Sequence, residues 1–174
     1  WDIYLFGARA SADPVSVNIS GLTDANDFSS PDGAWFSYAN PGLMWIQTDD
    51  GAYTDVTNCM MLAAVPGEVG DGFSTTVVNV DGATTQTVQT YVGKQPGEER
   101  LRRFLVGPKE CEITGIAESP DGKALFVNIQ HPGEDTAPDF ATGAFGSHWP
   151  DGGLARPRSA TIVITREDGG VIAL

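Results

Sequence analysis

The chain has 174 residues, a net charge of −13 and a pI near 4.2. This length can bury one substantial core, while the 21 Gly, the 11 Pro and the lack of a long period-3.6 stretch indicate an all-β fold. The acidity argues against nucleic acid and anionic membranes as partners, because both require basic patches. It suits hard cations such as Ca²⁺, or simply keeps the chain in solution. No apolar run is long enough to span a bilayer, and no signal peptide is visible.

The first 30 residues are expected to form two short strands, at 1–8 and 15–19, within an irregular acidic stretch. Since the chain starts at Trp1 inside the first of these strands, we interpret it as a processed piece of a longer protein. On this interpretation the missing signal peptide says little about where the parent protein resides.

A four-stranded β unit is predicted over about residues 31–109. Turns rich in Pro, Gly and Asp separate its strands, which are expected at 34–37, 43–47, 60–65 and 100–106. A hairpin is inserted between the third and fourth strands, at about 66–97. Its two Thr- and Val-rich runs flank Asp81-Gly82, a pair that favours a type I′ turn.

A second β unit is predicted over about residues 111–174. Its first two strands, at 113–117 and 124–129, are joined by a tight turn at 119–122. A long Pro- and Gly-rich loop at 131–158 leads to a third strand at 160–165, and a fourth is expected at 171–173. Two antiparallel four-stranded units have the size of two blades of a β-propeller, which needs typically four to eight. The open edges would then be covered by missing sequence or by other copies of the chain, so self-association is possible.

Each unit places an acidic residue at the start of its first strand. Asp32 and Glu112 hold equivalent places 80 residues apart, which predicts a structural repeat. Because the first two strands of the second unit are antiparallel, Glu112 should lie beside the segment 128–134. A carboxylate and the imidazole of His131 would then share one face.

The motifs of this chain resemble those of the PhoX-type alkaline phosphatases over most of residues 28–174, with the hairpin at 66–97 as a departure. The matching motifs, in chain order, are Ser-Pro-Asp-Gly-Ala-Trp-Phe (30–36), Leu-Met-Trp-Ile-Gln-Thr-Asp (43–49), Asn-Cys-Met-Met-Leu-Ala (58–63), Arg-Phe-Leu-Val-Gly-Pro (103–108), Cys-Glu-Ile-Thr-Gly (111–115), Leu-Phe-Val-Asn-Ile-Gln-His-Pro-Gly-Glu (125–134), Ser-His-Trp-Pro-Asp-Gly (147–152) and Arg-Pro-Arg-Ser-Ala-Thr (156–161).

The resemblance implies a six-bladed propeller exported to the periplasm or the outside of the cell. It implies hydrolysis of small phosphate monoesters with iron and calcium ions, here Fe³⁺ and Ca²⁺, held by acidic side chains and a cysteine. Glu112, Asp32 and Asp49 match the motifs as metal ligands, with Glu112 first. The remaining ligands would belong to upstream blades, so the chain by itself is expected to be inactive.

Arg156, Arg158 and His131 are candidates for binding the substrate phosphate, because guanidinium forks match phosphate geometry. A surface salt bridge for the arginines and a structural hydrogen bond for the histidine are the plainer interpretations. Cys111 could be a metal-bound thiolate or a buried inert thiol, and a Cys59–Cys111 disulfide stays open. No sequence motif nominates a catalytic nucleophile.

Two other functions fit the same residues. One is a Ca²⁺-dependent propeller hydrolase of the lactonase type, which a substrate panel would distinguish. The other is a non-catalytic propeller that serves as an interaction module, in which the acids at 32 and 112 would bind no metal.

Overall fold

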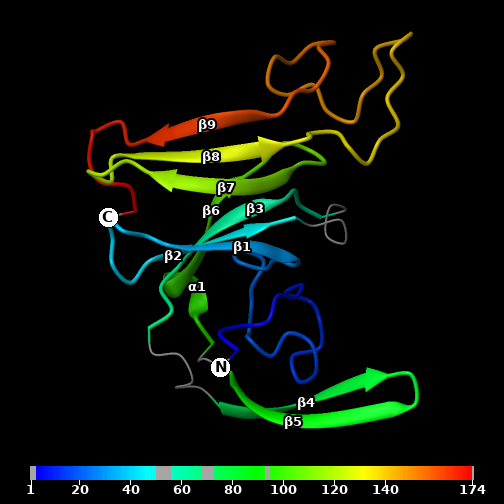
Figure 1. Cartoon of the computed structure of the whole chain (residues 1–174), viewed down its shortest axis with the longest axis vertical. Helices are drawn as coiled ribbons and strands as arrows, with labels where there is room; N and C mark the ends of the chain where they lie inside the picture. Colours follow the sequence, from blue (N-terminus) through cyan, green and yellow to red (C-terminus); the bar gives the residue numbers. More distant parts are fainter. Residues whose placement is uncertain (1–2, 50–55, 68–72, 93–94, 174) are drawn as a thin grey trace.

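A computed structural model describes residues 3–49, 56–67, 73–92 and 95–173, and Figure 1 shows the whole chain. Over these ranges the regular secondary structure is almost entirely antiparallel strands, as the composition predicts. None of the described helices is long and apolar enough to cross a membrane. In chain order the elements are β1 (Pro31–Phe36), β2 (Met44–Thr48), β3 (Met60–Ala64), β4 (Phe73–Asp81), β5 (Thr84–Val92), α1 (Gly97–Arg100), β6 (Leu101–Val106), β7 (Glu112–Glu118), β8 (Ala124–Gln130) and β9 (Ala160–Thr165).

The predicted first unit forms a four-stranded antiparallel sheet in the order β1-β2-β3-β6. Trp35 pairs with Trp45, and Ala64 pairs with Leu101 across the β3–β6 ladder. The β1–β2 pairing contains an irregularity at Asp32, between Pro31 and Gly33, where the register shifts.

The predicted hairpin is β4–β5, and it is inserted between β3 and β6 without interrupting their pairing. It lies apart from the two larger sheets, and its backbone is joined to the N-terminal segment where Ile3 N donates to Tyr91 O at 3.0 Å. The predicted type I′ turn is wrong. Of the two turn residues, Gly82 has a positive φ of +57° and Ala83 does not. A type I′ turn needs a positive φ at both residues, whereas a type II′ turn needs it only at the first, where glycine is preferred.

The second unit is a three-stranded sheet in the order β7-β8-β9. The fourth strand expected at 171–173 is wrong, because these residues form a turn. Ile172 is buried in the core, and its N–H donates to Gly122 O at 2.9 Å. This apolar segment therefore packs against the turn between β7 and β8 and does not add a strand to the sheet.

The two strands expected in the N-terminal segment are also wrong. Residues 15–19 lie in turns, and of the stretch expected at 1–8 residues 1 and 2 lie outside the described residues. Within the described residues 3–30, β-bridges are limited to the positions Ile3, Ala8 and Phe28, and Ala8 pairs with Phe28. In this segment side-chain oxygens accept hydrogen bonds from backbone N–H groups that a strand would bond to a neighbouring strand. Asn18 Oδ1 accepts from Leu22 N at 2.8 Å, and Ser20 Oγ accepts from Phe6 N at 2.8 Å.

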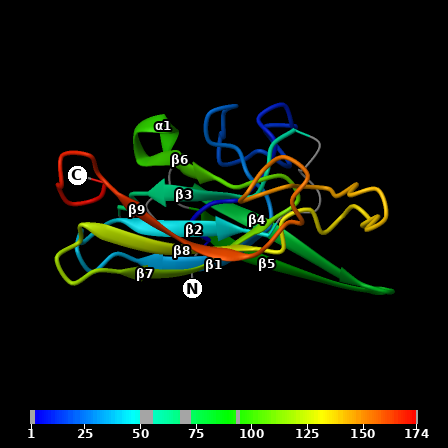
Figure 2. The ribbon, with the colours of Figure 1, turned by 90° about the horizontal axis from the view of Figure 1, so that it is seen from above.

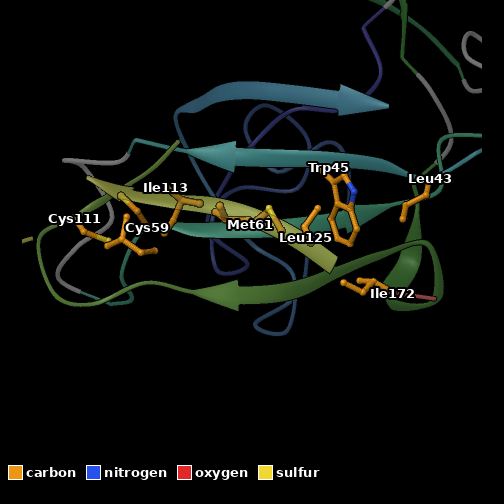
Figure 3. Packing of buried hydrophobic residues seen from close by; sticks show 10 residues of the cluster. Leu43, Trp45, Cys59, Met61, Cys111, Ile113, Leu125 and Ile172 are labelled. Atoms are coloured by element: carbon orange, nitrogen blue, oxygen red, sulfur yellow. The ribbon is translucent and has the colours of Figure 1, made fainter. Parts of the chain in front are cut away.

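The β1-β2-β3-β6 sheet is covered on both faces, which explains why β2 is buried along its whole length. One set of alternating side chains, which includes Met44 and Leu62, packs with Leu22 and Phe28 of the N-terminal segment. The other set includes Trp45 and Met61 and packs against Leu125 and its neighbours on β7 and β8, as Figure 3 shows. Continuous apolar runs in β2 and β3 follow from this double coverage.

Strand β7 lies against the first sheet, and polar side chains fasten this contact. Gln47 Nε2 donates to Gly115 O at 3.0 Å, where a bulge with a positive φ at Gly115 turns the carbonyl outward. The loop 131–158 projects from the end of the second sheet opposite the chain's C-terminus (Figures 1 and 2). The strand ends at that side of the molecule therefore carry the candidate site.

Candidate functional site

The site begins where β7 starts and β8 ends, because Glu112 pairs with Gln130 in the ladder. The next residue, His131, has φ +30°, and this turn directs its ring between two carboxylates. His131 Nε2 lies 3.4 Å from Glu112 Oε2, and its Nδ1 lies 2.7 Å from Glu134 Oε2. The structure thus brings together the carboxylate and the imidazole that antiparallel pairing places side by side. Glu134 was missed, although it stands three residues after His131 in the same motif.

Glu112 differs from the other buried or half-buried glutamates of this region. Glu110 receives hydrogen bonds from Thr136, and Glu118 receives them from Trp45 and from backbone N–H groups. Glu112 is 8% exposed, yet the described part of the chain donates no hydrogen bond to its carboxylate. His131 Nε2 lies 3.4 Å from it, and that ring nitrogen is closer to Gln130 Nε2, at 2.7 Å. A buried carboxylate is costly unless it is paired or coordinates a metal.

The environment of Glu134 connects Asp49 to the same cluster. Burial is the largest influence on the Glu134 carboxyl and raises its pKa; the charges of Asp135 and Asp49 raise it further, while His131 opposes them. Asp49 itself is exposed, just beyond the end of β2. The structure therefore places Asp49 within electrostatic reach of Glu134 and on the side of Glu112.

Asp32 lies elsewhere. It occupies the start of β1, as Glu112 does in β7, but its side chain is exposed and lines a separate hollow with Tyr4 and Phe28. That hollow also contains Met44 and Ile46, which belong to the sheet face covered by the N-terminal segment. The described structure does not bring Asp32 together with Glu112.

Glu110 fixes the loop that carries the site, and the sequence offered no sign of this role. Its carboxylate accepts from Thr136 N at 3.0 Å and Thr136 Oγ1 at 2.8 Å, and Lys109 Nζ lies 2.8 Å from it. Its carbonyl accepts from Gly133 N at 2.7 Å. Burial is the largest single influence on the Glu110 carboxyl and opposes ionisation, but the contacts with Lys109 and Thr136 hold its pKa below the usual value. Glu110 is therefore an ionised anchor for the first part of the loop.

A pocket of about 350 Å³ lies between this loop and the start of β9. His131, Glu134 and Arg156 line it, so three charged or titratable side chains meet there. The guanidinium of Arg156 lies 5.2 Å from the ring centre of Phe140 and makes no hydrogen bond or ion pair within the described ranges. Arg158 is outside the pocket lining and pairs with Asp151 at 2.5 Å.

The remaining candidates have structural surroundings. Cys59 and Cys111 are both reduced and buried, and burial, followed by the nearby Cys59 and acidic charges, raises the pKa of Cys111 to about 12. His148 Nδ1 lies 2.8 Å from Ala155 O, which ties this ring to the loop backbone.

The donor set around Glu112 is one of carboxylate oxygens and an imidazole, which suits hard cations and iron. Within the ranges that the structure describes, no three His, Cys, Asp or Glu side chains converge closely enough to hold a metal ion. The chain therefore presents part of a possible ligand set.

Comparisons with known proteins bear on the same region. The family model described as alkaline phosphatase PhoX matches residues 1–133. A solved structure, "Pseudomonas fluorescens PhoX in complex with vanadate, a transition state analogue", is 34% identical, with a TM-score of 0.63; the match covers 97% of this chain and 23% of that one. Comparison with curated proteins gives no match.

Proposed function

Because the chain belongs to the PhoX alkaline phosphatase family, we propose that it is part of a metal-dependent phosphatase that hydrolyses small phosphate monoesters. The chain spans 23% of the length of the Pseudomonas fluorescens protein. We therefore propose that other segments complete the site and that these 174 residues are inactive by themselves.

The observation that carries this proposal is the state of Glu112. Its carboxylate is buried at the start of β7 and receives no hydrogen bond from the described residues, and His131 Nε2 lies 3.4 Å away. A bound cation would supply the missing compensation. Glu112 is our proposed first ligand, with Asp49 as a second and Asp32 as a ligand only if other segments bring a metal to its separate hollow. A cluster of Ca²⁺ and Fe³⁺ would neutralise the phosphoryl charge and lower the pKa of a bound water.

Arg156 is the proposed phosphate ligand of this chain. Its guanidinium lines the pocket and lies over the Phe140 ring, 5.2 Å from the ring centre. Since it makes no hydrogen bond or ion pair within the described ranges, its N–H groups are available to phosphate oxygens. Arg158 is held by Asp151, which favours the structural alternative for that residue. His131 Nδ1 lies 2.7 Å from Glu134, which suits this ring to orient that carboxylate, while its Nε2 lies 2.7 Å from Gln130 Nε2. We propose that a protonated His131 donates to a phosphate oxygen.

The architecture supports a propeller as the setting of this site. A four-stranded antiparallel sheet in sequential order, stacked face to face on the next sheet, is how neighbouring blades are built. We propose that the chain forms about two blades of a six-bladed propeller, that the rest of the protein covers its open edges, and that the protein acts in the periplasm or outside the cell.

The test is to measure metal content and p-nitrophenyl phosphate turnover of the protein that contains this chain, with and without Glu112→Gln. We expect bound metal to be lost and activity to fall by at least about 10- to 100-fold, the range seen when partners of a metal site are removed. Glu167→Gln, an exposed residue in the turn after β9, is the matched control. Full activity in Glu112→Gln would remove this residue from the site. A metal-free, inactive wild type would instead favour a non-catalytic interaction module.

A further inference from the structure

We propose that the pocket under the loop 131–158 binds the organic part of the phosphate ester and favours substrates whose alcohol carries an aromatic ring. This inference rests on the proposed phosphatase function and adds a substrate class to it. Phe140 and Phe145 would be the specificity-determining residues.

The pocket has the size and lining of a small-molecule site. Its volume of about 350 Å³ lies within the usual range of roughly 300–1,000 Å³ for ligand pockets. Five of its twelve lining residues are flat apolar groups, five have polar side chains and two are glycines. The flat groups are Pro132, Pro138, Phe140, Phe145 and Pro157.

The two phenylalanines are already arranged as aromatic rings prefer. Their ring centres are 5.7 Å apart with planes at 70°, an edge-to-face pair. Phe145 makes a second such contact with His148, at 5.9 Å and 78°. Phe140 is 65% exposed and stacks with the Arg156 guanidinium, so its ring is presented at the pocket rather than buried in a core. A further ring could join this series through offset or edge-to-face contacts.

The aromatic part of the pocket adjoins its charged part. His131 and Glu134, which form a cluster of titratable side chains with Glu112, line the same pocket as Phe140 and Phe145. An ester whose phosphoryl group is held at the cluster would therefore have its carbon skeleton in the space lined by the rings.

The wall that carries these rings is held in place. A side chain at Gly146, next to Phe145, would have its Cβ 2.8 Å from Gly133 O, and one at Gly133 would have it 2.7 Å from Ser147 N. Two stretches of the loop thus pack backbone against backbone, and Glu110 fastens the first of them through Thr136. A preformed pocket of this kind binds its ligand with little ordering cost.

The experiment compares benzyl phosphate with glycerol 2-phosphate, because both release an aliphatic alcohol and differ in the ring. The protein that contains this chain is assayed for kcat/KM on each ester, as wild type and as Phe140→Ala and Phe145→Ala. We expect the preference for benzyl over glycerol phosphate to fall by about 3- to 10-fold in each variant, mainly through KM, as expected from losing an aromatic contact. Phe140→Tyr, which keeps the aromatic ring, should retain the wild-type preference for benzyl phosphate over glycerol 2-phosphate.

Phe126→Ala is the matched control, since this half-exposed ring lies on β8 and outside the pocket lining. An unchanged preference in both alanine variants, with both esters still hydrolysed, would overturn this inference and leave the phosphatase proposal standing. A wild type that hydrolyses neither ester would overturn both.

Discussion

The carboxylate of Glu118, at the end of β7, accepts a hydrogen bond from the indole Nε1 of Trp45, on β2, at 3.2 Å. Its other oxygen accepts from Tyr38 N at 2.8 Å and Ala39 N at 3.3 Å, in the turn between β1 and β2. One side chain of the second sheet thereby holds both a strand and a turn of the first sheet. Ionic hydrogen bonds of this kind are stronger than neutral ones, so this contact should be a measurable part of the stability of the sheet pair.

Replacing Glu118 tests that contact. Glu118→Ala should lower the free energy of unfolding by about 1–3 kcal/mol, because three partly buried or exposed N–H donors lose a charged acceptor. Urea denaturation at pH 7 measures the change, and Glu167→Ala, at an exposed turn, is the control. Equal unfolding free energies for the two variants would show that the cross-sheet bonds contribute nothing.

The same contact predicts a pH dependence. Burial is the largest single influence on Glu118 and opposes ionisation, but hydrogen bonds from Ser37, Tyr38, Trp45 and Ala39 outweigh it and lower its pKa below the ordinary value of 4.5. A carboxyl with a lowered folded-state pKa stabilises the protein above its unfolded pKa, and this contribution is lost as the pH falls through the folded value. The stability difference between wild type and Glu118→Gln should therefore shrink between pH 5 and pH 3 in urea denaturation. A difference that stays constant over this range would contradict the assignment.

Arg156 and Arg158 form a matched pair for substrate binding. Arg156→Ala should raise KM for p-nitrophenyl phosphate, and the inhibition constant of inorganic phosphate, by about 10-fold or more, since it removes a charged hydrogen-bond donor. Arg158→Ala should change both by less than about 2-fold, because it breaks only an exposed pair with Asp151. Steady-state kinetics of the two variants measure this, and the reverse order of effects would move the phosphate contact to Arg158.

Cys111 should be unreactive in the folded protein. Its pKa of about 12 leaves almost no thiolate at pH 8, and its side chain is buried at the contact between the two sheets. In a Cys59→Ala background, iodoacetamide should label Cys111 slowly in buffer and completely in guanidinium chloride, as read by mass spectrometry. Rapid labelling of the folded protein would indicate a thiolate stabilised by an unrecognised partner.

Removing the hairpin should leave the first sheet intact. Strands β4 and β5 pair with each other, and the β3–β6 ladder forms without them. Replacing residues 67–96 by a short Gly-Ser linker should shift the melting temperature by only a few degrees, as measured by circular dichroism. A variant that fails to fold would show that the hairpin stabilises the sheet through contacts beyond its bond to Ile3.

Local patterns predicted those parts of the fold that depend on neighbouring residues. The Thr- and Val-rich runs around Asp81-Gly82 identified the hairpin, and the apolar runs at 43–47 and 60–65 identified β2 and β3. The prediction failed where an apolar run packs on the face of a sheet without itself forming a strand. Residues 1–8 were expected to pair, but Tyr4 and Leu5 pack on the face of the first sheet within an irregular segment.

The sequence predicted only the part of the candidate site that depends on the pairing of β7 with β8. Glu112 is the first residue of β7 and pairs with Gln130, the last residue of β8. Antiparallel pairing therefore places Glu112 beside His131, the residue that follows β8. The equivalence of Asp32 and Glu112 within their strands does not say how the two sheets stack. In the structure Asp32 lines a hollow beside the N-terminal segment, whereas Glu112 is buried beside His131. The anchoring role of Glu110 depends on where a long loop returns, which strand patterns do not encode.

The insertion of the hairpin between β3 and β6 also bears on the order of folding. The pair Ala64↔Leu101 closes a loop of 36 residues (101 minus 64 minus 1). Loop closure costs entropy that grows with the logarithm of the number of free residues. Strands β4 and β5 can zip from their own turn within microseconds, which shortens the free part of that loop before β6 arrives. We therefore expect the β4–β5 ribbon to form before β6 pairs with β3, so that it brings the last strand of the first sheet within reach of its partner.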